Sequence, residues 1–162
     1  MTNDTKKSYK GSDKVRDVMA TDVDTVNPST KVGEAARQMR DMNVGSLPVV
    51  DRQELVGILT DRDITIRVAA DGLSADEVLV KEIMTANPVT ISPDQTVDEA
   101  TEVMSQHQVR RLPVVENGKL VGILALGDIA TDPDSQDEAA SALTDISQPS
   151  EFDRSIQSNS QA

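Results

Sequence analysis

An internal duplication constrains the fold of this chain more than any other feature. Shifting the sequence against itself by 65 residues aligns 15–64 with 80–129 without a gap, and 20 of the 50 aligned positions are identical. Average composition would give roughly three identities over that length. The chain therefore contains one structural unit twice, and we expect both copies to fold in the same way.

Each copy begins its clearest pattern with an amphipathic helix, whose apolar residues recur at helical spacing. These residues are Val32, Ala35, Ala36 and Met39 in the first copy, and Val97, Ala100 and Met104 in the second. Thr96, with Glu99 three residues later, predicts a capping box at the start of the second of these helices.

Two β-branched runs divided by a short polar turn follow each helix, in "LPVVDRQELVGIL" and "LPVVENGKLVGIL". Asn117-Gly118 predicts a type I′ hairpin turn, because both residues tolerate a positive φ. Beyond the hairpins, "TDRDITIRVAADG" and "ALGDIATD" predict a second helix in each copy, the first ending at Gly72. The predicted order is strand, helix, strand, strand, helix, which is a mixed α/β (α+β) fold.

One such unit cannot bury enough apolar surface alone, so the two copies are expected to pack sheet to sheet about a pseudo-two-fold axis. The predicted organisation is a flexible segment over 1–14, a first repeat with its linker over 15–79 and a second repeat over 80–130. An acidic tail follows over 131–162, with seven acids against one base. Within it, "SQDEAASALTDIS" is compatible with either a short helix or solvated disorder.

Composition excludes several classes of function. The chain has no cysteine and a single histidine, His107, so neither a disulfide framework nor a cysteine- or histidine-rich metal site is expected. The formal charge of −12 disfavours a nucleic-acid partner. No run reaches the roughly 18 apolar residues of a membrane span, and the expected location is the cytoplasm.

Thr60 and Asp63, in "GILTDRDI", have two alternative interpretations. One is a capping box, in which the two residues only stabilise a helix start. The other is a ligand site, and the second copy favours it, because Ala125 replaces the threonine there while Asp128 remains. We interpret the retained aspartate as having a second role, such as accepting two hydroxyl groups of a ribose.

Arg110 and Arg111 are a candidate source of positive charge for a phosphate. They occupy the positions that Gly45 and Ser46 hold in the first copy. Under a pseudo-two-fold axis, the arginines of the second copy would face the Thr60 turn of the first. The opposite site would lack both the threonine and the guanidinium groups, giving one competent and one impaired cleft. The alternative is that the two arginines form a solvated face.

Together the duplicated unit, the "LPVV" strands and the "GILTDRD" turn resemble a pair of CBS domains, also called a Bateman module. The resemblance covers about 15–130. With "MRDMNVGSLPVV" and "HQVRRLPVVENGKLVGIL", the chain is similar to stand-alone prokaryotic CBS-pair proteins, including those of hypoxic-response type.

The resemblance implies a sensor that holds AMP, ADP, ATP or S-adenosylmethionine between the repeats and catalyses no reaction. It implies a main nucleotide-binding cleft formed by Thr60, Asp63, Pro88, Val89, Thr90, Val109, Arg110 and Arg111. It implies a second, impaired cleft formed by Val23, Thr25, Val44, Gly45 and Asp128. The arginines favour a phosphate-bearing ligand over the sulfonium compound, and no resident cofactor or metal is implied.

The resemblance also implies a homodimer formed through the helices of the repeats. Met39, Met42 and Met104 are candidates for that interface or for the core. A second class of function is a structural or protein-interaction module with vestigial clefts, binding an unidentified protein. An independent enzyme is disfavoured, because the sequence has no nucleophile–base set and no glycine-rich phosphate loop.

Overall fold

The structure, a computed structural model, describes residues 9–129, and these contribute to two compact units. Of the described residues, one unit contains 9–18, Asp94–Leu112 and 124–129; the other contains Met19–Pro93 and Pro113–Ile123. The acidic tail predicted over 131–162 lies outside the described residues.

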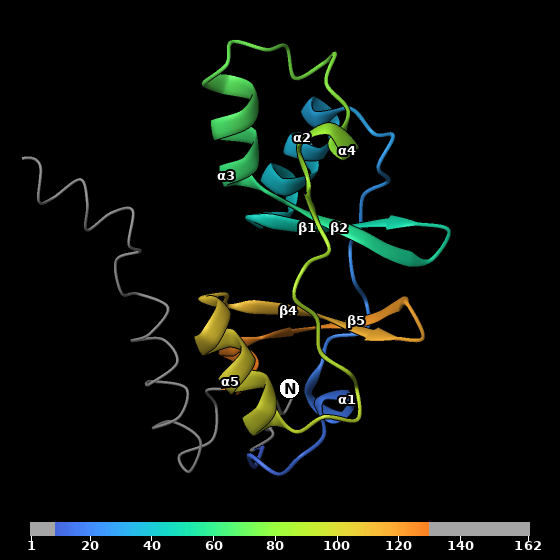
Figure 1. The fold of residues 1–162 in the computed structure, drawn as a ribbon, viewed down its shortest axis with the longest axis vertical. Helices are drawn as coiled ribbons and strands as arrows, with labels where there is room; N and C mark the ends of the chain where they lie inside the picture. Colours follow the sequence, from blue (N-terminus) through green and yellow to red (C-terminus); the bar gives the residue numbers. More distant parts are fainter. Residues whose placement is uncertain (1–8, 130–162) are drawn as a thin grey trace, which may run out of the picture. The chain divides into compact units, whose positions relative to one another are not determined.

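The described elements follow one another twice in nearly the same order (Figure 1). The first series is α1 (Val15–Val18), α2 (Val32–Met42), β1 (Ser46–Asp51), β2 (Glu54–Thr60), α3 (Asp61–Ile64) and the π-helix η1 (Thr65–Ala69). The second is α4 (Val80–Ile83), β3 (Thr85–Ala86), α5 (Val97–His107), β4 (Arg111–Glu116), β5 (Lys119–Ala125) and α6 (Leu126–Ile129). The predicted mixed α/β fold of two repeats is confirmed.

The two long helices end alike, and α5 also begins with the predicted cap. The capping box at Thr96 is confirmed, with Glu99 N donating to Thr96 Oγ at 3.2 Å and Thr96 N donating to Glu99 Oε2 at 2.7 Å. Each helix ends in a left-handed residue, Asn43 or Gln108. The next amide then bonds back into the last turn, as Val44 N does to Met39 O at 3.0 Å.

The hairpin turns have the left-handed backbone that was predicted for Asn117-Gly118. Asn117 has φ 52° and Gly118 has φ 78°. In the first copy the same turn is built from Arg52 at φ 48° and Gln53 at φ 72°. Neither of these two is a residue type that adopts a positive φ readily, so the first hairpin is held by its strands and not by its turn residues.

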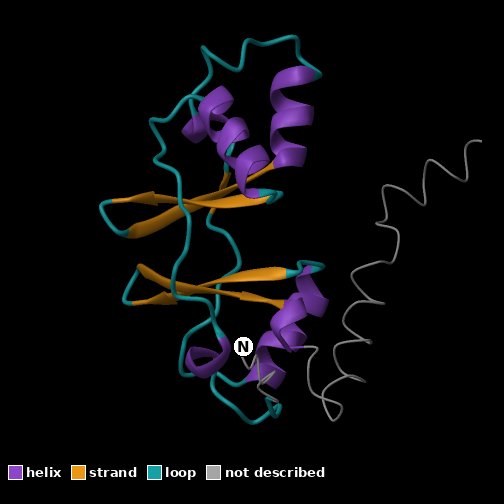
Figure 2. Cartoon of the chain, turned by 180° about the vertical axis from the view of Figure 1, so that it is seen from behind, coloured by secondary structure: helices purple, strands orange, loops and turns teal. Residues whose placement is uncertain are grey.

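The two hairpins, drawn among the orange strands of Figure 2, belong to one sheet of order β1-β2-β5-β4. They join at their turns, where Leu55 N donates to Gly118 O at 3.2 Å and Leu120 N donates to Gln53 O at 3.3 Å. The two bonds are equivalent when the sequence is shifted by 65 residues. The duplication is therefore present in the backbone pairing as well as in the sequence.

The first strand expected in each copy is reduced to a single bridge. Val26 pairs with Val49, and Ile91 pairs with Val114, both in parallel. The segment before Val26 contains Asp22 and Asp24, and aspartate is depleted in strands. A short helix, α1 or α4, precedes this segment in each repeat and was not predicted.

The segment that opens each repeat pairs with the hairpin of the other repeat. Strand β3, at the start of the second repeat, pairs with Gly57 and Ile58 of β2. Ala20, at the start of the first repeat, pairs with Ile123 of β5. Just before the predicted start of the first repeat, Gly11 O and Asp13 O accept from the amides of Asp98 and Val97.

Each unit has its own aliphatic core. In Figure 1, α2, α3 and α4 lie on one side of the β1–β2 hairpin, and the core there is Val26, Val32, Ala35, Met39, Leu47, Val49, Leu59, Val68, Val80 and Ile83. In the other unit the buried apolar residues are Val15, Val18, Val97, Ala100, Met104, Leu112, Leu124, Leu126 and Ile129. Met39 and Met104 therefore belong to the core. Of the helices in the described residues, none is both long and apolar enough to span a bilayer.

Candidate functional site

The turn from β2 into α3 places Thr60 and Asp63 against each other. Asp63 N donates to Thr60 Oγ at 3.1 Å, and Thr60 N donates to Asp63 Oδ2 at 3.0 Å. Both residues are half-buried. The capping-box interpretation is confirmed. The cap uses only one oxygen of the Asp63 carboxylate, and the other, Oδ1, has no hydrogen-bond partner among the described residues.

The second copy corrects one step of the sequence argument. Ala125 cannot accept with a side chain, yet Ala125 N still donates to Asp128 Oδ2 at 3.3 Å. The returning half of the cap needs only a backbone amide, which every residue except proline supplies. The retention of Asp128 can therefore be explained by the cap alone, and a ligand role for Asp128 stays a prediction.

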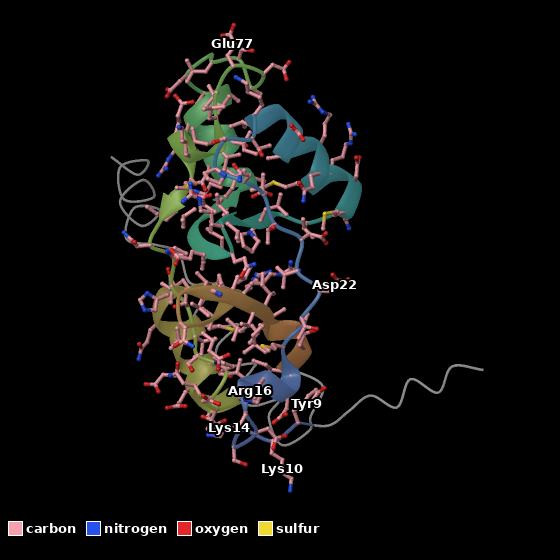
Figure 3. All side chains as sticks on the ribbon, turned by 90° about the vertical axis from the view of Figure 1, so that its right-hand side faces the viewer. Tyr9, Lys10, Lys14, Arg16, Asp22 and Glu77 are labelled. Atoms are coloured by element: carbon pink, nitrogen blue, oxygen red, sulfur yellow. The ribbon has the colours of Figure 1, made fainter. Side chains whose placement is uncertain are left out.

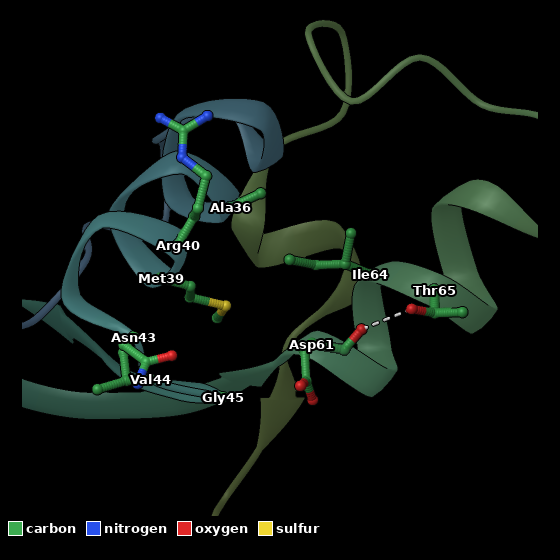
Figure 4. A pocket seen from close by; sticks show the side chains of 9 residues that line it. All are labelled: Ala36, Met39, Arg40, Asn43, Val44, Gly45, Asp61, Ile64 and Thr65. Atoms are coloured by element: carbon green, nitrogen blue, oxygen red, sulfur yellow. Dashed lines mark hydrogen bonds between the residues drawn. The ribbon is translucent and has the colours of Figure 1, made fainter.

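A pocket of about 450 Å³ opens beside the Thr60 turn, between α2 and α3 (Figure 4). Its lining consists of Ala36, Met39, Arg40, Asn43, Val44, Gly45, Asp61, Ile64 and Thr65. The backbone joins two of these, since Asp61 N donates to Gly45 O at 2.9 Å. The Thr65 hydroxyl donates to Asp61 O at 3.0 Å, the dashed line in Figure 4. Val44 and Gly45, predicted for the second cleft, thus lie beside the turn of their own repeat.

Arg110 likewise lies beside the strand-to-helix turn of its own repeat. Leu126 N donates to Arg110 O at 2.8 Å, which is the counterpart of the bond between Asp61 and Gly45. Arg110 and Arg111 are both exposed, and Arg111 is the first residue of β4. The predicted partnership of these arginines with Thr60 links residues of the two different units, and it stays a prediction.

The remaining predicted residues lie on two segments. Pro88 and Val89 are half-buried and Thr90 is exposed, and they follow β3. Val109, half-buried, caps the end of α5 by donating to Met104 O at 3.0 Å. None of these four lines the pocket beside Gly45.

Val23 and Thr25 line a second pocket of about 390 Å³. The other residues of its lining are Thr21, Val50, Gln53, Lys119, Leu120 and Val121. Half of the lining residues are aliphatic, while Lys119 supplies a cation and Gln53 an amide. These two residues were missed in the sequence, because Gln53 lies in a hairpin turn and Lys119 begins the strand after one, and neither position carries a ligand motif.

Asp61 was also missed, although a comparison of the two copies contains the signal. Asp61 of the first copy corresponds to Leu126 of the second, and Gly45 corresponds to Arg110. A Cβ atom added to Gly45 would lie 3.3 Å from Asp61 Oδ2. The first copy thus combines a small residue with a neighbouring carboxylate where the second combines an arginine with a leucine.

Away from this turn, one carboxyl has a shifted pKa. Hydrogen bonds from the Thr96 amide and then the Thr96 hydroxyl lower the pKa of Glu99 from its usual 4.5.

Basic side chains gather near α1, where Lys10, Lys14 and Arg16 project outward (Figure 3) and Arg16 forms an ion pair with Asp94. Within residues 9–129 there is no group of three histidine, aspartate or glutamate side chains suited to holding a metal ion.

Comparison with known proteins identifies the family. The CBS domain model matches residues 15–70 and again residues 80–132. The chain belongs to the CBS-domain family. CBS domain-containing protein YhcV of Bacillus subtilis is 46% identical over 133 residues, which are 82% of this chain and 94% of that protein. Hypoxic response protein 1 of Mycobacterium tuberculosis is 37% identical over 116 residues, covering 71% of this chain and 81% of that protein.

Two solved structures have the same CBS-pair fold. The crystal structure of Hypoxic Response Protein I with two coordinated zinc ions gives a TM-score of 0.67 at 36% identity, covering 73% of this chain and 97% of that one. The crystal structure of CBSX2 in complex with AMP gives 0.63 at 29% identity, covering 72% and 92%. The predicted resemblance, including its hypoxic-response type, is confirmed, and the chain is a CBS-pair regulatory module.

Proposed function

We propose that this CBS pair senses an adenine nucleotide held in a cleft between its two repeats. The observation that carries the proposal is the state of Asp63. Its Oδ2 atom is fixed by the Thr60 amide at 3.0 Å, while Oδ1 has no partner in residues 9–129. A half-buried carboxylate that is oriented but incompletely satisfied is suited to accept the vicinal hydroxyls of a ribose.

The ligand's phosphate needs donors, and two sources are proposed. The Thr60 hydroxyl accepts from Asp63 N and still has its own proton to donate. Arg110 and Arg111 are exposed and have guanidinium groups suited to bidentate contact with phosphate oxygens. Pro88, Val89, Thr90 and Val109 are proposed to contact the base. The AMP complex of CBSX2 supports the choice of an adenine nucleotide.

For the second cleft we propose Asp128 with Val23, Thr25, Val44 and Gly45. The pocket that Val23 and Thr25 line supports a role for that segment. Binding of the ligand can change the conformation of the protein only if the ligand has different affinities for two arrangements of the repeats or of two chains. In this account the protein holds no permanent cofactor and works in the cytoplasm.

The proposed assembly is a homodimer formed through helices. Met39 and Met104 are 5% and 0% exposed, so they are not available for an interface. In the described part of the chain, the exposed large apolar side chains are Ile66 at 49% and Leu73 at 50%. Ile66→Glu is expected to shift a dimer to a monomer in sedimentation velocity, whereas Glu77→Gln, at the exposed loop residue labelled in Figure 3, should not.

A thermal-shift screen with AMP, ADP, ATP, S-adenosylmethionine and GMP tests the function. A ligand that binds the folded state raises the melting temperature by mass action, so we expect a rise with the adenine nucleotides and less with GMP. A rise only with S-adenosylmethionine would replace the nucleotide with that ligand. No rise with any of them would favour a protein-interaction module, to be tested by capture with full-length and tail-deleted chains.

A further inference from the structure

The two copies present opposite charges at equivalent turns. In the first copy the turn after Thr60 contains Asp61, Arg62 and Asp63, and the adjoining strand entry contains Gly45. In the second copy the equivalent turn contains Leu126, Gly127 and Asp128, and the strand entry contains Arg110-Arg111. The first turn therefore has an excess of negative charge, and the second has an excess of positive charge.

Within each copy, the residue that differs at the turn lies next to the residue that differs at the strand entry. Asp61 N donates to Gly45 O at 2.9 Å, and Leu126 N donates to Arg110 O at 2.8 Å. The carboxylate of Asp61 lies against Gly45, because a Cβ atom there would be 3.3 Å from Oδ2. Asp61 and Gly45 also line the same pocket. A larger residue at position 45 would force this carboxylate to move.

We propose that Asp61 selects against long phosphate chains at the Thr60 turn, so that this turn prefers AMP to ATP. The proposal rests on the function proposed above and deepens it by naming the ligand class. Each phosphate beyond the first adds negative charge near two carboxylates that are two residues apart, and this repulsion opposes the attraction that the proposed function assigns to Arg110 and Arg111. The repulsion between like charges near a protein surface grows with the charge of the ligand. ATP is therefore expected to be repelled more strongly than AMP. Asp61 is exposed and its Oδ1 accepts from Arg62 N at 2.8 Å, so the turn's own backbone orients this carboxylate without a ligand.

Calorimetric titration of AMP and ATP into the wild type and Asp61→Asn tests this selection. Asparagine keeps the oxygen that accepts from Arg62 N, so the turn should fold as before. We expect Asp61→Asn to lower the Kd for ATP by about tenfold and to leave that for AMP nearly unchanged. The difference should shrink at high salt, because exposed charges are screened. Repeating both titrations with Asp128→Ala confines the measurement to the Thr60 turn.

Asp71→Asn is the matched control, since it changes the net charge equally at an exposed residue ten positions after Asp61 that does not line the pocket. Both nucleotides could bind while Asp61→Asn leaves the ratio of their Kd values unchanged. That result would overturn the selection and leave the proposed function standing. An equal change with Asp71→Asn would also overturn it, because the effect would then come from net charge. Absence of binding by either nucleotide would overturn both.

Discussion

Thr60 and Asp63 hold each other through two hydrogen bonds, one from each backbone amide to the other's side chain, at 3.0 Å and 3.1 Å. The pair starts α3 and at the same time fixes the carboxylate that we assign to the ribose. Structural and ligand roles, alternatives in the sequence, are therefore compatible in one pair of residues. Stability and binding can be separated by choosing which half of the pair is changed.

Replacing Thr60 with alanine should destabilise the fold by about 1 kcal/mol, because the acceptor for Asp63 N is lost. The reverse substitution can be made in the second copy, because Ala125 occupies the position equivalent to Thr60. Ala125→Thr should restore a full cap there and raise the free energy of unfolding. Urea denaturation measures both. Equal stability of Thr60→Ala and the wild type would show that the cap contributes nothing.

Gly57→Ala should destabilise the protein by roughly 1–3 kcal/mol, as overpacking does. A Cβ atom there would lie 2.7 Å from Met84 Sδ and 2.9 Å from Thr85 O, and the second of these is backbone. The clash should displace β3, which opens the second repeat. Gly122→Ala is the internal match, with 2.6 Å to Met19 Sδ and 2.9 Å to Ala20 O. Thermal unfolding of both variants at the wild-type melting temperature would contradict these close contacts.

Gln53→Gly should stabilise the first hairpin by about 0.5–1 kcal/mol. Gln53 has φ 72°, and its counterpart in the second hairpin is Gly118 at φ 78°. Gly118→Gln, the reciprocal change, should destabilise the second hairpin by a similar amount. Chemical denaturation of the two single variants measures the difference. A loss of stability in Gln53→Gly would mean that its side chain contributes more than the strained backbone costs.

Stability should decrease with acid in part through Glu99. Its pKa in the folded state is below the usual 4.5 because the Thr96 amide and hydroxyl bond the charged form. A carboxyl with a lowered folded pKa stabilises above its unfolded pKa, and that contribution disappears as the pH falls through the folded value. Unfolding curves below about pH 4.5 should therefore depend less on pH in Glu99→Gln. The same dependence on pH in Glu99→Gln and the wild type would contradict this contribution.

Much of the fold follows from the sequence because the duplication doubles each local signal. The helix from Val32 and the hairpin at Asn117-Gly118 combine periodicity with terminal residues, and both are where they were expected. The opening segments are different, since α4 and β3 gain their partners from the first repeat. Pairing between distant segments leaves no local pattern, so no propensity could assign it.

The site was predictable only in part. Thr60 and Asp63 were found because a capping box has a fixed spacing, but that spacing could not show that Asp63 Oδ1 remains without a partner among the described residues. Gly45 was found through its difference from Arg110. Asp61 was not, because its contact with Gly45 depends on how the strand entry meets the helix start.

Titration of AMP into the wild type and into Asp63→Asn, followed by calorimetry, tests the central claim most directly. Asparagine keeps an oxygen that can accept from the Thr60 amide, and circular dichroism should confirm an unchanged fold. We expect the wild type to bind and Asp63→Asn to lose roughly 1.5–3 kcal/mol of binding free energy, the contribution of hydrogen bonds to a charged acceptor. Equal affinity of the two proteins, or absence of binding by the folded wild type, would contradict the account.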